Sequence, residues 1–121
     1  ITLSERKIRP VAHNEQRIEQ AIKHIHSNYE RRIHISELAA VAGLSEGYFY
    51  RLFRQVVKNT PIEYINRYRV NKAAILLLNT HDKITKIAID TGFDSSTRFI
   101  DVFKKYMQCT PTEYRNLNRN N

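Results

Sequence analysis

The chain has 121 residues, of which 41% are hydrophobic and 26% are charged, and its formal net charge is +8. That length suits one ordinary domain or two very small ones sharing a core, and the composition excludes a disordered or low-complexity chain. No apolar run approaches the roughly 18 residues that a membrane span needs, so we expect no membrane association.

Charge and cysteine content indicate which class of partner and which cellular location to expect. The positive surplus is spread along the sequence, which favours a polyanionic partner, although basic charge also serves solubility alone. Cys109 is the only cysteine, so no intrachain disulfide can form and a reducing cytoplasmic location is expected. The opening residues ITLSERKIRP are charged and lack an initiator methionine. We therefore expect residues 1–12 to be an N-terminal extension from a longer parent protein.

The first predicted helix lies in NEQRIEQAIKHIHSNY. Four residues recur on one face of this helix and predict that it covers the segment that follows: Ile18, Ile22, Ile25 and Tyr29. His24 and His26 are two residues apart and project from diverging faces, so they make a poor metal-binding pair.

A pattern of helix, tight turn and helix begins at Ile35 and again at Ile84. ISELAAVAGLSEGYFYRLFRQVVKNTPIEY and ITKIAIDTGFDSSTRFIDVFKKYMQCTPTEY align, with one extra residue in the second turn. Glycine stands where each first helix should stop. The predicted caps are Ser36 and Ser45 in the first copy and Asp94 or Ser95 in the second.

The second helix of each copy carries an apolar stripe at helical spacing. These stripes comprise Phe49, Leu52, Phe53 and Val56, and then Phe99, Val102, Phe103 and Tyr106. A Thr-Pro pair then opens another helix in each copy, with Thr as the N-cap. The final short helix is expected to turn Tyr114 and Leu117 inward.

Two short helices joined by a turn containing glycine form a helix-turn-helix, whose second helix enters the DNA major groove. We therefore predict an all-α protein with an extension and three further segments. A first helix-turn-helix subdomain spans residues 13–60, a long linker helix spans residues 61–80, and a second helix-turn-helix subdomain spans residues 81–121. A rigid linker of about 25 Å could hold two such helices about one DNA turn apart.

The segment from Ile35 to Arg115 resembles the DNA-binding domain of the AraC/XylS family of bacterial transcription regulators. In the second copy, IAIDTGFDSSTRFIDVFKKYMQCTPTEYR is similar to the family pattern of IA, GF, F, FKK, TP and YR. The resemblance implies seven helices, with two helix-turn-helix modules bridged by a long helix, and a structural role for Arg69. The family usually has glycine where this chain has Lys58 and Gln108. A left-handed backbone there would cost about 1 kcal/mol.

The positions expected to contact DNA lie opposite the apolar stripes. The predicted base-reading residues are Glu46, Gly47, Tyr50, Arg51, Ser96, Thr97, Ile100 and Asp101. The resemblance implies that these are also the family's base-reading positions. The predicted phosphate contacts are Ser45, Arg54, Lys83, Lys86, Ser95, Lys104 and Lys105.

Four of the predicted base-reading residues admit two interpretations each. Arg51 suits bidentate contact with guanine, or else a phosphate contact without sequence information. Tyr50 suits stacking or contact with a thymine methyl group, or else packs on the surface against Arg54. Ile100 suits a thymine methyl group, or else is one of the scattered apolar residues that are common on protein surfaces. Asp101 either accepts a hydrogen bond from cytosine N4 or pairs with Arg98 or Lys105 within its helix.

The sequence contains neither a nucleophile beside a base nor a phosphate-binding loop, so we expect no enzymatic activity, cofactor or metal. The predicted function is sequence-specific binding of double-stranded DNA by a transcription regulator. Family habit implies an activator with RNA polymerase as a partner, and an effector or dimerisation domain N-terminal to this region. The alternative is a basic helical module for protein interaction.

Overall fold

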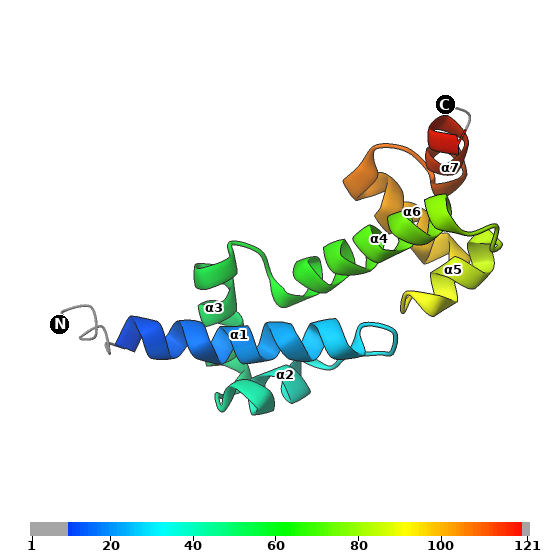
Figure 1. Ribbon diagram of the computed structural model, residues 1–121. Coiled ribbons are helices and arrows are strands. Elements are labelled where there is room, and N and C mark those ends of the chain that lie inside the picture. The colour runs from blue at the N-terminus through cyan, green and yellow to red at the C-terminus, as the bar shows by residue number, and fades with distance from the viewer. Residues whose placement is uncertain (1–9, 120–121) are drawn as a thin grey trace. The chain divides into compact units, whose positions relative to one another are not determined.

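The computed structural model describes residues 10–119 of the protein, and every regular element in that range is a helix. Figure 1 shows these seven helices, which confirm the predicted all-α class. They are α1 (Pro10–Asn28), α2 (Ile35–Ala42), α3 (Glu46–Val57), α4 (Pro61–Asn79), α5 (Ile84–Asp90), α6 (Ser96–Met107) and α7 (Pro111–Arg119). Most of the predicted extension, residues 1–9, lies outside the described residues. None of the described helices is long and apolar enough to cross a membrane.

The described chain divides into two compact units. The first unit comprises residues 10–28 and 33–64, and the second unit comprises residues 29–32 and 65–119. Helix α4 begins in the first unit and continues into the second. Each unit contains one helix-turn-helix, formed by α2 and α3 in the first and by α5 and α6 in the second.

The first unit buries one face from each of its three N-terminal helices, with α1 packed against α2 and α3 (Figure 1). Its buried apolar side chains come from all three: Ile18, Ala21, Ile25, Leu38, Ala39, Ala42, Phe49, Leu52 and Phe53. The two phenylalanines of α3 have no exposed surface, and their ring centroids lie 5.7 Å apart. This buried stripe fixes which face of α3 is turned outward.

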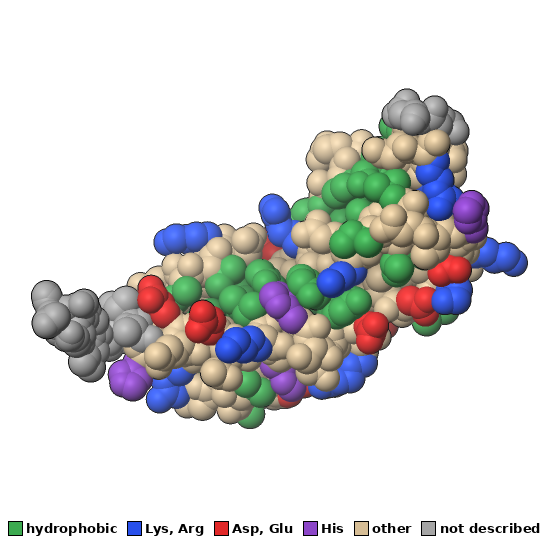
Figure 2. All heavy atoms as spheres, viewed as in Figure 1, with side chains coloured by type: hydrophobic (Ala, Val, Ile, Leu, Met, Phe, Trp, Pro, Cys, Tyr) green, Lys and Arg blue, Asp and Glu red, His purple; other side chains and the backbone are tan. Residues whose placement is uncertain are grey.

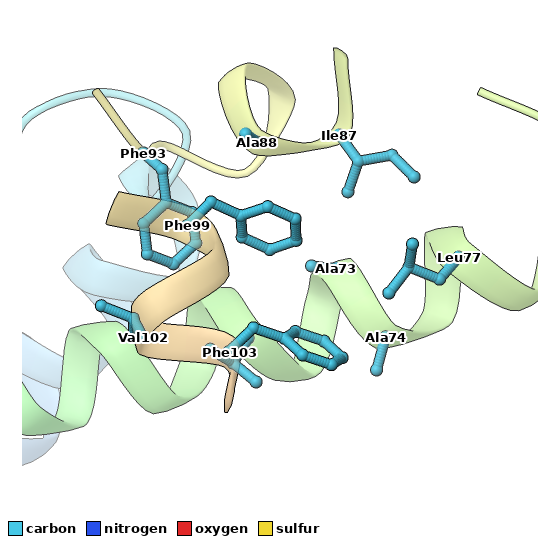
Figure 3. Close-up of a cluster of buried hydrophobic side chains, with 10 residues drawn as sticks. Ala73, Ala74, Leu77, Ile87, Ala88, Phe93, Phe99, Val102 and Phe103 are labelled. Carbon is cyan, nitrogen blue, oxygen red and sulfur yellow. The ribbon is translucent and has the colours of Figure 1, made fainter. Parts of the chain in front are cut away.

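The second unit repeats that arrangement around α6. Figure 3 shows its core, in which Phe99 and Phe103 of α6 lie among side chains from α4 and α5. Their ring centroids are also 5.7 Å apart, and Phe93 from the preceding turn packs against Phe99 at 5.2 Å. The same aromatic pair therefore anchors the second helix of both helix-turn-helix units.

The repeated phrase TPxEY is a helix start. At α4, the Thr60 backbone N–H donates to Glu63 Oε1 at 2.9 Å, and the Glu63 N–H donates to Thr60 Oγ1 at 3.1 Å. At α7, Thr110 and Glu113 make the same two bonds at 2.8 and 3.1 Å. Each pair forms a capping box, which satisfies two backbone donors that a helix N-terminus otherwise leaves free. The Thr-Pro pair predicts the helix start from sequence, whereas the glutamate that completes the capping box was not predicted.

Two glycines make the tight turns possible. Gly43 and Gly92 follow α2 and α5 with φ of 74° and 95°, in the left-handed region that glycine adopts without steric cost. A Cβ at Gly92 would also collide with the carbonyl oxygen of Tyr29. Gly92 is therefore required both for its backbone conformation and for the close approach of residues 29–32.

Several local expectations were wrong. Helix α2 begins at Ile35 after His34, so Ser36 lies within the helix and is not its cap; Glu37 Oε1 instead accepts the His34 N–H at 3.1 Å. Tyr29 lies beyond α1 in the second unit, where its ring contacts Tyr68 edge-on. Leu117 is 64% exposed because it lies on the outer face of the last helix. Val56, near the end of α3, is also partly exposed because the buried stripe ends at Phe53.

Lys58 and Gln108, which stand where the family usually has glycine, both have left-handed backbone conformations. Lys58 ends α3 with φ of 70°, and Gln108 ends α6 with φ of 65°. The Gln108 side chain partly compensates, because its Nε2 donates to the Lys105 carbonyl at 3.1 Å.

Replacement of Lys58 with glycine should therefore stabilise the protein by about 1 kcal/mol, because glycine adopts this conformation without a Cβ penalty. Gln108→Gly is the matched control and should gain less, since it also loses a hydrogen bond. Urea unfolding of the wild type and the two variants measures the differences in the free energy of unfolding. Equal or reversed gains would contradict this account of the two helix ends.

The capping box of α7 makes a second prediction, about pH. Hydrogen bonds from the backbone and side chain of Thr110 hold the pKa of Glu113 below its ordinary value of 4.5. Because the folded pKa is the lower one, the stabilisation from ionised Glu113 is complete above about pH 4.5 and is lost as pH falls through the folded value. NMR titration should show this carboxyl titrating below pH 4.5. The Glu113→Gln variant should lose the part of the pH dependence of the unfolding free energy that comes from this carboxyl. A Glu113 pKa at or above that value would exclude the effect.

Candidate nucleic-acid interface

The outward face of α3 carries all five residues expected there. Glu46, Gly47, Tyr50, Arg51 and Arg54 are exposed, whereas Phe49, Leu52 and Phe53 on the opposite face of the helix are buried. Because side chains three and four residues apart share one face of a helix, Gly47, Tyr50, Arg51 and Arg54 form a contiguous surface. A single amphipathic helix therefore supplies both the anchor and the exposed surface.

Arg51 is held in an orientation that leaves its donors accessible. Its guanidinium carbon lies 5.9 Å from the ring centroid of Tyr48, within the range of a cation–π contact. None of the ion pairs among residues 10–119 includes Arg51. A planar guanidinium supported by a ring and not neutralised by a carboxylate suits bidentate recognition of an acceptor pair.

The outward face of α6 has different chemistry at the same positions. Thr97, Asp101 and Lys104 are exposed, while Ser96 and Ile100 are half-buried. Ile100 is thus less available than expected for an apolar contact, since part of its side chain is already covered. Where α3 presents Arg51, α6 presents Asp101, so the two surfaces differ in the sign of their central charge.

Asp101 lies beside possible partners without pairing with them. It lines a surface hollow of about 240 Å³ together with Asn66, Arg98 and Lys105, yet no ion pair within the described residues includes it. The Lys105 ammonium instead lies 5.6 Å from the ring centroid of Tyr106. The structure therefore leaves the Asp101 carboxylate free to accept a hydrogen bond from outside the chain.

The two serines expected at phosphates are the N-caps of α3 and α6. Ser45 Oγ accepts the Tyr48 N–H at 3.4 Å, and Ser95 Oγ accepts the Arg98 N–H at 3.1 Å. A hydroxyl that accepts a backbone N–H still has its own O–H to donate. Both serines can therefore cap a helix and contact a phosphate oxygen at the same time.

The lysines expected at phosphates are not equally available. Lys83 and Lys104 are exposed, but Lys86 Nζ lies 2.6 Å from Asp90 and 3.7 Å from Asp82. The hydrogen bond to Asp90 and the charges of both carboxylates raise the pKa of Lys86. Because two carboxylates surround this ammonium, the support for a phosphate contact is weakest at Lys86.

Four arginines are engaged in holding the fold together. Arg69 Nε and Nη2 donate to the carbonyls of Tyr29 and Arg31 at 2.9 and 2.8 Å, and burial lowers the pKa of its guanidinium. Arg17 caps the C-terminal end of α2, and Arg115 and Arg119 cap that of α4. Figure 2 shows Lys and Arg side chains interspersed with Asp and Glu side chains on the face in view.

Of these four arginines, only Arg69 was predicted to have a structural role, through the family resemblance. No spacing rule marks the others, because each carbonyl partner is distant in sequence from its arginine. The net charge of the chain therefore overstates the basic surface that is available for a polyanion.

The histidines of α1 make local contacts. His24 Nε2 lies 2.7 Å from Glu37 Oε2, and His26 Nε2 lies 2.8 Å from the Tyr64 hydroxyl. Within the part of the chain that the structure describes, no group of three potential metal ligands comes together. The contacts of His24 and His26 join α1 to α2 and to the start of α4 within the first unit.

Comparison with known proteins places this geometry in a family. A family model described as a helix-turn-helix domain matches residues 38–117. The chain is 33% identical over 102 residues to the melibiose operon regulatory protein of Escherichia coli strain K12, which covers 84% of this chain and 34% of that regulator. The chain spans only 28–35% of the length of the first curated relatives that it matches.

Two solved structures are similar in fold. One is a transcriptional regulator with an AraC-type DNA-binding domain from Chromobacterium violaceum, with a TM-score of 0.81 and 27% identity over 89% of this chain and 96% of that one. The other is the DNA-binding domain of AdpA in complex with a target DNA, with a TM-score of 0.81, covering 84% of this chain and 92% of that one. At 24% identity, the second similarity supports the fold alone.

Proposed function

The chain belongs to the AraC/XylS family of bacterial transcription regulators, and on that basis we propose that it binds double-stranded DNA sequence-specifically through α3 and α6. The observation that carries the proposal is the repeated anchoring of these helices. In each unit a buried phenylalanine pair turns the opposite, polar face outward. In a helix-turn-helix, that face of the second helix is the one that enters the major groove.

Base recognition is assigned to the outward faces of the two helices. On α3 these residues are Glu46, Gly47, Tyr50 and Arg51, and on α6 they are Ser96, Thr97, Ile100 and Asp101. Arg51 would donate to guanine O6 and N7, and Asp101 would accept from cytosine N4. The support for both is their exposure and the lack of an ion pair to either within the described chain.

Phosphate contacts would hold the protein in register on the duplex. They are assigned to Ser45, Arg54, Lys83, Ser95, Lys104 and Lys105, and with weaker support to Lys86. Lysine and arginine neutralise phosphates, and the N-termini of α3 and α6 add backbone N–H donors. Because one polypeptide carries both helices, a single chain would read two successive major-groove segments without requiring a palindrome.

The length of the relatives supports a proposal about a longer parent protein. Since this chain spans about a third of their length, effector sensing or dimerisation is assigned to a region N-terminal to it. Activation through contact with RNA polymerase is the corresponding proposal for transcription, and the cytoplasm is the expected location. Neither enzymatic activity nor a cofactor is required for this function.

Two substitutions separate base reading from phosphate binding. On a duplex selected from a random pool with the purified chain, Arg51→Ala should lose about 1–3 kcal/mol of discrimination at one base pair. Lys104→Ala should weaken binding to selected and scrambled duplexes alike, and should reduce the salt dependence by about one phosphate contact. Titrations with both duplexes at several salt concentrations measure the two effects.

Equal losses on both duplexes for both variants would contradict the assignment of Arg51 to a base. A wild-type chain that binds neither duplex at low salt would overturn the proposed function. That result would instead favour a basic module for protein interaction.

A further inference from the structure

The chain has three glycines, and the fold accounts for only two of them. Gly43 and Gly92 have positive φ, and a Cβ at either would meet another group at less than ordinary contact distance. Gly47 differs on both counts. Its φ lies outside the left-handed region, and an added Cβ would meet only Arg51 Nη1, at an ordinary contact distance of 3.7 Å.

Gly47 nevertheless occupies a position where glycine is unfavourable. It is the second residue of α3 and is exposed to solvent. Apart from proline, glycine is the least favourable residue in a helix, because its backbone loses the most conformational freedom on folding. Alanine would fit the space and form the helix more readily, so the folded chain itself gives no reason for glycine here.

The second unit provides an internal comparison. Ser45, Phe49 and Phe53 of the first unit correspond to Ser95, Phe99 and Phe103 of the second, as N-cap and buried pair. Gly47 then corresponds to Thr97, which lies exposed in the same first turn of α6. A side chain with a branched Cβ is thus accommodated at this position of the helix-turn-helix, so its architecture does not require glycine.

The neighbours of Gly47 indicate what its missing side chain exposes. Tyr50 and Arg51 follow it by three and four residues and share its face, and the nearest atom to the missing Cβ belongs to the Arg51 guanidinium. The N-terminal residues of such a helix are the ones that meet base edges. Glycine is the residue that lets a backbone approach a ligand most closely.

We propose that Gly47 is a positioning residue of the DNA interface, kept for the depth at which α3 enters the major groove. This inference rests on the proposed function. Without a side chain at this position, the first turn of α3 approaches the bases closely enough for Arg51 to reach guanine. A side chain there would keep the first turn of α3 further from the bases than glycine does, and one longer than alanine would also restrict the Arg51 guanidinium beside it.

The test uses stability and DNA affinity together, because a structural glycine and a positioning glycine give opposite signs. Gly47→Ala should raise the thermal midpoint by about 3 °C, as expected for removing glycine from an exposed helix. It should also weaken binding to a duplex selected from a random pool by about tenfold, and Gly47→Gln by about a hundredfold. The matched control is Asn71→Ala, an exposed position within α4, which should raise the midpoint without changing affinity.

A lower midpoint for Gly47→Ala would overturn the inference by giving the glycine a role in the fold. Binding of that variant as tight as wild type, or tighter, would overturn it as well. Should Gly47→Ala weaken binding no more than Asn71→Ala does, stabilisation alone would explain the effect, and the inference would fall. A wild-type chain that does not distinguish the selected duplex from a scrambled one would overturn the proposed function, and with it this inference.

Discussion

The buried phenylalanine pair of each second helix is the interaction on which the rest of the structure depends. Phe49 and Phe53 in α3, and Phe99 and Phe103 in α6, have no exposed surface. Removal of one such ring typically costs about 3–5 kcal/mol, a large part of the stability of a domain this small. Because both rings of a pair point into the core, the rotation of each helix about its axis is fixed. The outward face, and hence the set of residues that can meet a ligand, follows from that constraint.

Hydrogen bonds at the ends of the helices also stabilise the fold. Capping boxes start α4 and α7, serines start α3 and α6, and arginines distant in sequence close the ends of α2 and α4. These bonds satisfy backbone groups that short helices leave unpaired in high proportion. Serine and arginine, which close these helix ends, are also among the residue types assigned to phosphate contacts in the proposed function. The difference lies in burial, since Arg69 is held by two carbonyls whereas Arg51 remains exposed.

Much of this fold could be read from the sequence because its signals are local. The stripe through Phe49, Leu52 and Phe53 predicts one face of α3, and Thr60-Pro61 predicts the start of α4. The contacts that could not be predicted are those between residues far apart in the chain. Nothing local indicates that Tyr29 leaves the first unit to meet Arg69, or that Arg115 caps α4. At the candidate site, the sequence identified the outward positions, but it could not decide between pairing and exposure for Asp101, because that depends on where the side chains of Arg98 and Lys105 point.

The proposal to test first is that the outward face of α3 and the outward face of α6 each contact DNA. Backbone amide spectra of the isotope-labelled chain, recorded during addition of a selected duplex, test this most directly. If these faces contact DNA, the largest shifts occur in the first two turns of both helices, including the amides of Arg51 and Asp101. Shifts confined to other surfaces, such as the outer faces of α1 and α7, would contradict it.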